Sequence, residues 1–179
     1  MELFSEGIAQ TLESILENKE VREAYKKKVL LSYPKQTLIS ITFNIPGSIK
    51  TNPQIERVFQ LAITAFARYC RDNELKLIDT TCKLLATGPE YYAVIDSTRE
   101  DIKNICIQFE SFYQIGRLMD IDVYRLNAEE ELVIIDRDQL DRTPRKCFIC
   151  SNSAKACTRN KTHSIAELRQ KINEMCQTI

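Results

Sequence analysis

The stretch Gly116-Arg117-Leu118-Met119-Asp120-Ile121-Asp122-Val123 completes the pattern that decides the fold, and it also carries the first candidate site. If it forms a strand, its two aspartates lie on the same face of a sheet, because they are two residues apart. Adjacent like charges repel, and a divalent cation that also binds a phosphate is a common remedy. The stretch therefore favours phosphate chemistry at Asp120 and Asp122. The alternative is a pair of solvated charges on an exposed strand face.

The segments around this stretch alternate between strand-like and helix-like patterns. Residues 37–44 are rich in Ile, Thr and Phe, which predicts a strand, and a long amphipathic helix follows with Asn52 as its cap and Pro53 in its first turn. Strands are expected at 75–85 and 91–95. The turn between them contains Gly88-Pro89.

A second core helix precedes the aspartate strand, and Thr98 is its candidate cap. Residues 132–135 are expected to return beside the aspartate strand as a hairpin. The order strand, helix, strand, strand, helix, strand predicts an α+β fold with a ferredoxin-like βαββαβ core and an antiparallel sheet. Both long helices should then lie on one face of that sheet. The inner face of the second helix is expected to carry Ile102, Ile105, Cys106, Phe109 and Phe112.

Helical patterns also flank this core on both sides. Segments near 5–17 and 19–32 predict N-terminal helices, the first with an apolar stripe of Ile8, Leu12, Ile15 and Leu16. The lysines at 26–28 form a solvated helix face or assist a phosphate ligand or an acidic partner. Ser164 and Glu167 form a capping box at the start of a final helix. We expect one domain over 1–179, with N-terminal helices in 1–33, an α/β core in 37–136 and a basic Cys/His segment with a C-terminal helix in 144–179.

Composition excludes several classes of function. The chain has 25 Lys+Arg and 25 Asp+Glu, so bulk attraction to nucleic acid or to a membrane surface is not expected. No apolar stretch is long enough to span a bilayer, and no secretory signal pattern is evident at the start. The odd count of seven cysteines predicts a reduced, cytoplasmic protein whose thiols pack or bind metal.

The cysteine segment near the C-terminus has metal-ligand spacing. Cys147, Cys150, Cys157 and His163 follow the pattern Cys-x2-Cys-x6-Cys-x5-His, and three thiolates with one imidazole are a valid tetrahedral zinc set. The alternative is that the cysteines are small buried hydrophobic residues. The segment is also strongly cationic, which suits phosphate contacts or makes a solvated basic loop. Its cations are Arg145, Lys146, Lys155, Arg159 and Lys161.

Two further features stand near the ends of core elements. One follows the first strand and is the run Asn44-Ile45-Pro46-Gly47-Ser48-Ile49-Lys50, which predicts a sharp turn. Its lysine could hold a phosphate beside this turn. The alternative is that the run has no role beyond turning the chain. Glu110 lies late in the second core helix. It is either a third acid near the aspartate pair or, by default, an exposed helix carboxylate.

Taken together, these blocks resemble one family, the apo-citrate lyase phosphoribosyl-dephospho-CoA transferases, which are the holo-acyl-carrier-protein synthases of citrate lyase. The resemblance runs from about residue 20 to the final helix. The residues that carry it are Asn44-Ile45-Pro46-Gly47 with Lys50, Gly116-Arg117-Leu118 with Asp120-x-Asp122-Val123, and Pro144-Arg145-x-Cys147-x2-Cys150 with Ala154, Cys157, Arg159 and His163.

The resemblance implies a nucleotidyltransferase. Its members transfer the prosthetic group of 2'-(5''-triphosphoribosyl)-3'-dephospho-CoA to a serine of the citrate lyase acyl carrier protein, the gamma subunit, and release pyrophosphate. On residue chemistry, Asp120 and Asp122 would bind Mg²⁺ between the triphosphate and the serine oxygen, with Arg117 as the third catalytic residue. The candidate substrate-binding residues are Asn44, Gly47, Lys50, Gly116, Arg145, Arg159 and His163.

The sequence departs from the family pattern at two informative places. Tyr113-Gln114 stands where the family often has His-Pro, so a proton-transfer role for that histidine cannot be carried over. Asp136 stands where a serine is usual, which argues against it as a third metal ligand. Two other functions stay open. One is a non-catalytic carrier-protein-binding or assembly module with a zinc-stabilised tail, and the other is a nucleic-acid-binding zinc knuckle, which the neutral net charge disfavours.

Overall fold

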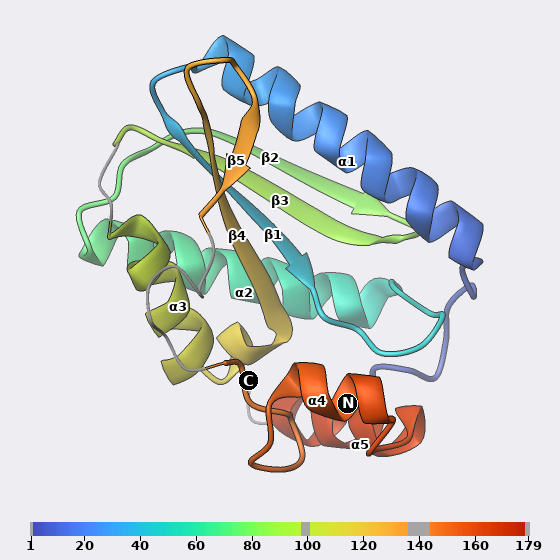
Figure 1. The fold of residues 1–179 in the computed structure, drawn as a ribbon. Helices are drawn as coiled ribbons and strands as arrows, with labels where there is room; N and C mark the ends of the chain where they lie inside the picture. The colour runs from blue at the N-terminus through green and yellow to red at the C-terminus, as the bar shows by residue number, and fades with distance from the viewer. Residues whose placement is uncertain (1, 98–100, 136–143, 178–179) are drawn as a thin grey trace.

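The computed structural model describes residues 2–97, 101–135 and 144–177, and Figure 1 shows their arrangement. The chain contains both helices and strands, with a short 3₁₀ helix, η1, directly before the aspartate strand. The elements are α1 (Leu12–Ser32), β1 (Thr37–Phe43), α2 (Pro53–Asp72), β2 (Leu77–Leu85), β3 (Gly88–Ile95), α3 (Ile102–Phe112), η1 (Ile115–Leu118), β4 (Met119–Leu126), β5 (Leu132–Ile134), α4 (Ala154–Asn160) and α5 (Ile165–Cys176).

The five strands form one antiparallel sheet in the order β2-β3-β1-β4-β5. The buried strand β1 lies between β3 and β4, and its residue Ile41 pairs with Tyr91 on one side and with Ile121 on the other. This central position explains the continuous run of apolar and β-branched residues in β1. The predicted α+β class with an antiparallel sheet is confirmed.

The two faces of the sheet bury different helices. Helices α2 and α3 pack on one face against Ile39, Ile121 and their neighbours, and the T-shaped ring pair Phe66–Phe109 joins the two helices. Helix α1 covers part of the opposite face, where its residue Leu30 packs against apolar side chains of the sheet. Because side chains alternate along β4, the aspartates lie on the α1 face. Within the described residues, no helix combines the length and the apolar composition needed to cross a bilayer.

The prediction of two N-terminal helices is wrong, because the structure has one, α1. Gly7 has a positive φ of 127°, and the backbone at Ala9 bridges to Ile49, so the residues before Thr11 are not helical. Thr11 caps the helix by accepting from the Ser14 amide. The helix then continues through Asn18 without a break. The expected apolar stripe near the start is exposed, with Ile8 at 79% and Leu12 at 73%.

Two details of the core also differ from expectation. The β2–β3 turn is formed by Ala86 and Thr87, whereas Gly88 and Pro89 already belong to β3. Phe112 was assigned to the inner face of α3, but its side chain is 83% exposed, because the last turn of α3 extends beyond the core. The helix caps at Asn52 and Ser164 agree with prediction. The predicted cap Thr98 and the variable Asp136 lie outside the described residues.

Candidate active site

The aspartate pair lies on β4, on the same face of the sheet as predicted. Asp120 and Asp122 face β1 beside Thr42 and Ser40, and their side chains are 56% and 38% exposed. Burial raises the pKa of Asp122, and the neighbouring Asp120 carboxylate raises it further. The two carboxylates are thus close enough to repel each other yet open to a ligand.

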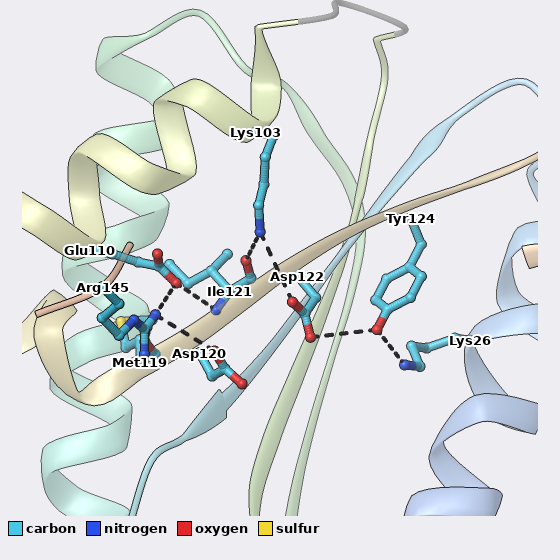
Figure 2. A network of polar contacts seen from close by, with 9 residues as sticks. All are labelled: Lys26, Lys103, Glu110, Met119, Asp120, Ile121, Asp122, Tyr124 and Arg145. Carbon is cyan, nitrogen blue, oxygen red and sulfur yellow. Dashed lines mark hydrogen bonds and ion pairs between the residues drawn. The ribbon is translucent and has the colours of Figure 1, made fainter. Parts of the chain in front are cut away.

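Side chains of α3 contact the outer edge of β4 beside this pair (Figure 2). Among the described residues, β5 pairs only with the far end of β4, from Tyr124 to Leu126. At the near end, Ile121 donates its amide to Glu110 over 2.9 Å and accepts from Lys103 over 2.6 Å. Buried backbone groups require such partners. Glu110 is only 6% exposed, so its default interpretation as an exposed carboxylate is wrong.

These edge contacts bring two cations to the carboxylates. Arg145 donates to Glu110 and, over 2.8 Å, to the Met119 carbonyl, and its guanidinium lies 3.6 Å from Asp120 Oδ1. Lys103 Nζ lies 4.0 Å from an Asp122 oxygen. Each aspartate therefore has one nearby cation, and each cation is held in place by a backbone carbonyl.

A tyrosine and a buried lysine extend this network toward α1. Tyr124 donates its hydroxyl toward Asp122 over 3.5 Å, and Lys26 donates to the Tyr124 oxygen over 2.8 Å (Figure 2). Burial and the charge of Asp122 raise the pKa of Tyr124, so this hydroxyl stays protonated. Of the lysine triplet, only Lys26 is buried, whereas Lys27 and Lys28 are exposed as a solvated face predicts.

A cleft of about 760 Å³ opens in front of the aspartates. It brings together five of the predicted site residues, which are distant in sequence. Cations of α4 and of the preceding segment face the carboxylates across this cleft, an arrangement that can bind phosphate groups and a divalent cation together. The predicted residues that line it are Asn44, Asp120, Asp122, Arg145 and Arg159, and Lys103 and Lys155 are additional cations.

The four predicted metal ligands converge beside this cleft. Their sulfur and imidazole nitrogen atoms all lie within 4.8 Å of one another, which is compatible with a tetrahedral site, where sulfurs bound to one zinc are about 3.8 Å apart. Amides of Ile149 and of Cys150 donate toward the Cys147 sulfur, and although burial opposes them, they hold the pKa of that thiol below its usual value. The cluster, Cys147, Cys150, Cys157 and His163, could hold a metal ion.

The backbone of the cysteine segment is folded so that these ligands meet. Lys146 bridges to Ser153, and Cys147 donates its amide to the Asn152 carbonyl over 2.8 Å, which closes a tight loop. Helix α4 carries Cys157 and ends at Lys161, which has a left-handed φ of 50°. The last ligand, His163, follows directly and lies 3.3 Å from the Cys150 sulfur.

Arg117 and Gly116 do not line the cleft in front of the aspartates. Arg117 donates to the Cys147 carbonyl over 2.9 Å and lies over the Phe148 ring, so it holds the cysteine segment against the body. Gly116 is buried against α3, where a Cβ atom would come within 2.3 Å of the Phe109 carbonyl oxygen. Both residues therefore have packing contacts near the site, Arg117 with the cysteine segment and Gly116 with α3.

The turn after β1 has structural contacts of its own. Lys50 donates to the Ile45 carbonyl over 2.7 Å, and partial burial lowers its pKa. Gly47 has a positive φ of 87° and lies against Arg169 of α5. Of this predicted run, Asn44 faces the acidic cleft, whereas Gly47 and Lys50 do not line it.

Sequence reasoning missed the groups that hold the acidic pair in place. Lys103 carries no local motif, Lys26 stood out only as a member of the lysine triplet, and Tyr124 reads as an ordinary strand residue. One signal was available, because Lys103 and Glu110 are seven residues apart on one face of a helix with no other charged residue, and a buried charge must find a partner.

An open pair of carboxylates beside cations could bind a phosphorylated substrate together with a divalent cation. A family model, CitX, apo-citrate lyase phosphoribosyl-dephospho-CoA transferase, matches residues 10–179. The chain belongs to this family.

Named relatives agree with this assignment. A protein named CitXG from Leuconostoc mesenteroides subsp. cremoris is 35% identical over 98% of this chain, which spans only 37% of that longer relative. A probable apo-citrate lyase phosphoribosyl-dephospho-CoA transferase from Streptococcus pyogenes serotype M3 is 36% identical over 96% of this chain and 88% of its own length. One of the same name from Vibrio cholerae serotype O1 is 30% identical over 94% of this chain and 92% of its own length.

Proposed function

We propose that this chain transfers the phosphoribosyl-dephospho-CoA group of 2'-(5''-triphosphoribosyl)-3'-dephospho-CoA to a serine of the citrate lyase acyl carrier protein. The family match over residues 10–179 carries this proposal. In the reaction, a bond forms between the serine oxygen and the α-phosphorus of the triphosphate, and the bond from that phosphorus to the pyrophosphate group breaks. The site must therefore neutralise phosphate charge and hold the attacking serine oxygen, the α-phosphorus and the leaving pyrophosphate oxygen in line.

The aspartate pair is the proposed Mg²⁺ site. Magnesium is commonly held by one or two carboxylates together with substrate phosphates, and Asp120 and Asp122 offer such a pair at an open cleft. Bound there, Mg²⁺ would supply positive charge to the triphosphate. Lys103 and Tyr124 orient the Asp122 carboxylate through the contacts described above, and Arg145 orients Asp120.

Cations on the cysteine segment are the proposed phosphate ligands. Arg145 and Arg159 line the cleft, and a guanidinium can pair with two phosphate oxygens at once. Asn44 and His163 stay candidates for substrate contacts because each lines a cavity at this site. We assign Arg117 to the positioning of the cysteine segment, because its guanidinium binds the Cys147 carbonyl.

We further propose that the Cys/His cluster holds Zn²⁺. Three thiols and one imidazole are soft and borderline ligands that suit zinc, and four protein ligands leave no open position, as in structural sites. Metal analysis of the purified protein should find about one zinc per chain. A metal-free protein with an intact cysteine segment would contradict this assignment.

We also propose a specific topology for the core of the fold. The strand order β2-β3-β1-β4, with α2 and α3 on one face, supports a ferredoxin-like βαββαβ core to which β5 is added. We treat residues 1–179 as one transferase domain, because the C-terminal helix α5 packs its residue Ile172 into the main core. We also propose a cytoplasmic location, which the seven free thiols support.

The decisive experiment incubates the protein with apo-carrier, the triphosphoribosyl precursor and Mg²⁺, and then measures the intact mass of the carrier. We expect a gain equal to one phosphoribosyl-dephospho-CoA group, and none on a carrier whose acceptor serine is replaced by alanine. No gain despite preserved carrier binding would contradict the transferase and favour a non-catalytic assembly module.

A further inference from the structure

A second cavity, of about 560 Å³, lies beside the acidic cleft and differs from it in chemistry. Its volume falls within the range of small-molecule sites. The turn after β1, the cysteine segment, α4 and the start of α5 form its walls. Much of its lining is apolar, from Pro46, Phe148, Ala154, Ile165 and Leu168.

Cations line this cavity together with Cys147, Cys157 and His163 of the Cys/His cluster. Arg145, Lys146 and Lys161 line it, and none of its described lining residues is an aspartate or a glutamate. Lys161 is exposed, and the left-handed turn that ends α4 fixes its backbone. An apolar wall with a cationic border suits a ligand that has a flat or aliphatic body and carries phosphates.

The cavity and the acidic cleft are neighbours that share a wall. Asn44, Arg145, Ala154 and Thr158 line both spaces. One extended ligand can therefore place a polyphosphate before the aspartates and its remaining part in the apolar cavity. The carboxylates occur only on the cleft side of this wall among the residues that line the two spaces.

We propose that the apolar cavity binds the adenosine diphosphate part of the dephospho-CoA moiety, an inference that rests on the proposed function. The adenine ring lies against the apolar wall near Phe148 and Leu168, and Lys146 and Lys161 pair with the diphosphate. The triphosphate of the same molecule then reaches the aspartates across the shared wall. This placement separates recognition of the nucleotide from the transfer step.

Calorimetric titration of the metal-loaded, full-length protein tests this placement without the transfer reaction. ADP, dephospho-CoA and pantethine serve as probes, with no added Mg²⁺. We expect ADP and dephospho-CoA to bind and pantethine, which lacks the nucleotide, not to bind. Lys161→Glu should raise the Kd for ADP roughly tenfold by replacing attraction with repulsion. Leu168→Asp should do the same by placing a charge in the apolar wall.

Matched variants separate a local effect from a folding defect. Lys28→Glu changes an exposed lysine on α1, and Leu61→Asp changes an exposed leucine on α2, so neither should alter the Kd. Circular dichroism and zinc content should be unchanged in all four variants. Asp120→Asn should leave ADP binding intact, since Asp120 does not line the cavity.

Two results would overturn the placement. One is an unchanged Kd for ADP in both Lys161→Glu and Leu168→Asp. The other is binding of pantethine without binding of ADP, which would assign the cavity to the pantetheine arm. Failure of the transfer assay alongside ADP binding that both variants weaken would instead count against the proposed function and leave the nucleotide site standing.

Discussion

The sheet body and the cysteine segment of this protein are stabilised in different ways. The body buries large side chains such as Phe59, Phe66 and Phe109 between the sheet and two helices. In residues 144–163, all of which the structure describes, only Cys147 and Cys157 are buried. Hydrophobic packing therefore specifies the body, whereas the segment depends on its ligand cluster and on arginine contacts with the body. The acidic cleft lies where these two regions meet.

Removing a core ring should have the largest effect on the stability of the body. Phe66→Ala should lower the free energy of unfolding by about 3–5 kcal/mol, because it leaves a cavity between α2 and α3. Phe112→Ala is the matched control on α3. Its exposed ring should contribute less than about 0.5 kcal/mol. Urea denaturation measures both values, and similar losses in the two variants would contradict the described core.

Substitution of Glu110 tests the contact between the two regions, and its effect on the free energy of unfolding should be intermediate. Glu110→Ala removes the acceptor of the Ile121 amide and the partner of Arg145, and should cost about 1–3 kcal/mol in urea denaturation. Glu110→Gln keeps an oxygen for the amide and should recover part of the loss. If alanine and glutamine cost nothing, the buried carboxylate does not hold the edge of β4.

The smallest effect on global unfolding is expected from the cysteine segment itself. Cys150→Ser should abolish zinc binding and speed proteolysis within 144–163, yet change the unfolding free energy of the body by less than about 1 kcal/mol. Cys82→Ser, on exposed β2, is the control and should keep the metal. Global destabilisation as large as that of Phe66→Ala would show that the two regions unfold as one unit.

The same contrast explains what the sequence could reveal. The body was largely predictable, because strand patterns and the caps at Asn52 and Ser164 are local signals. The cysteine ligands were predictable from spacing, and their sulfur atoms do converge. The N-terminal helices were mispredicted, since the bridge between Ala9 and Ile49 is a long-range contact.

The environment of the aspartates was harder to predict. Lys103 and Glu110 reach the backbone of β4 because its outer partner β5 is short and, among the described residues, pairs only with the far end of β4. This arrangement depends on the whole sheet. Arg117 occurs in the motif run, yet its guanidinium contacts the cysteine segment. Position in a motif thus predicted residues that line the cleft without giving each residue its contacts.

The rate of carrier modification in Asp120→Asn tests the central claim most directly. A time course of intact carrier mass should show transfer slowed by about 100-fold or more, while carrier binding is retained, because the substitution removes one negative charge and one cation ligand. Asp72→Asn, at the exposed end of α2, should transfer at the rate of the unmodified sequence. Transfer by Asp120→Asn at that same rate would contradict the assignment of the acidic pair.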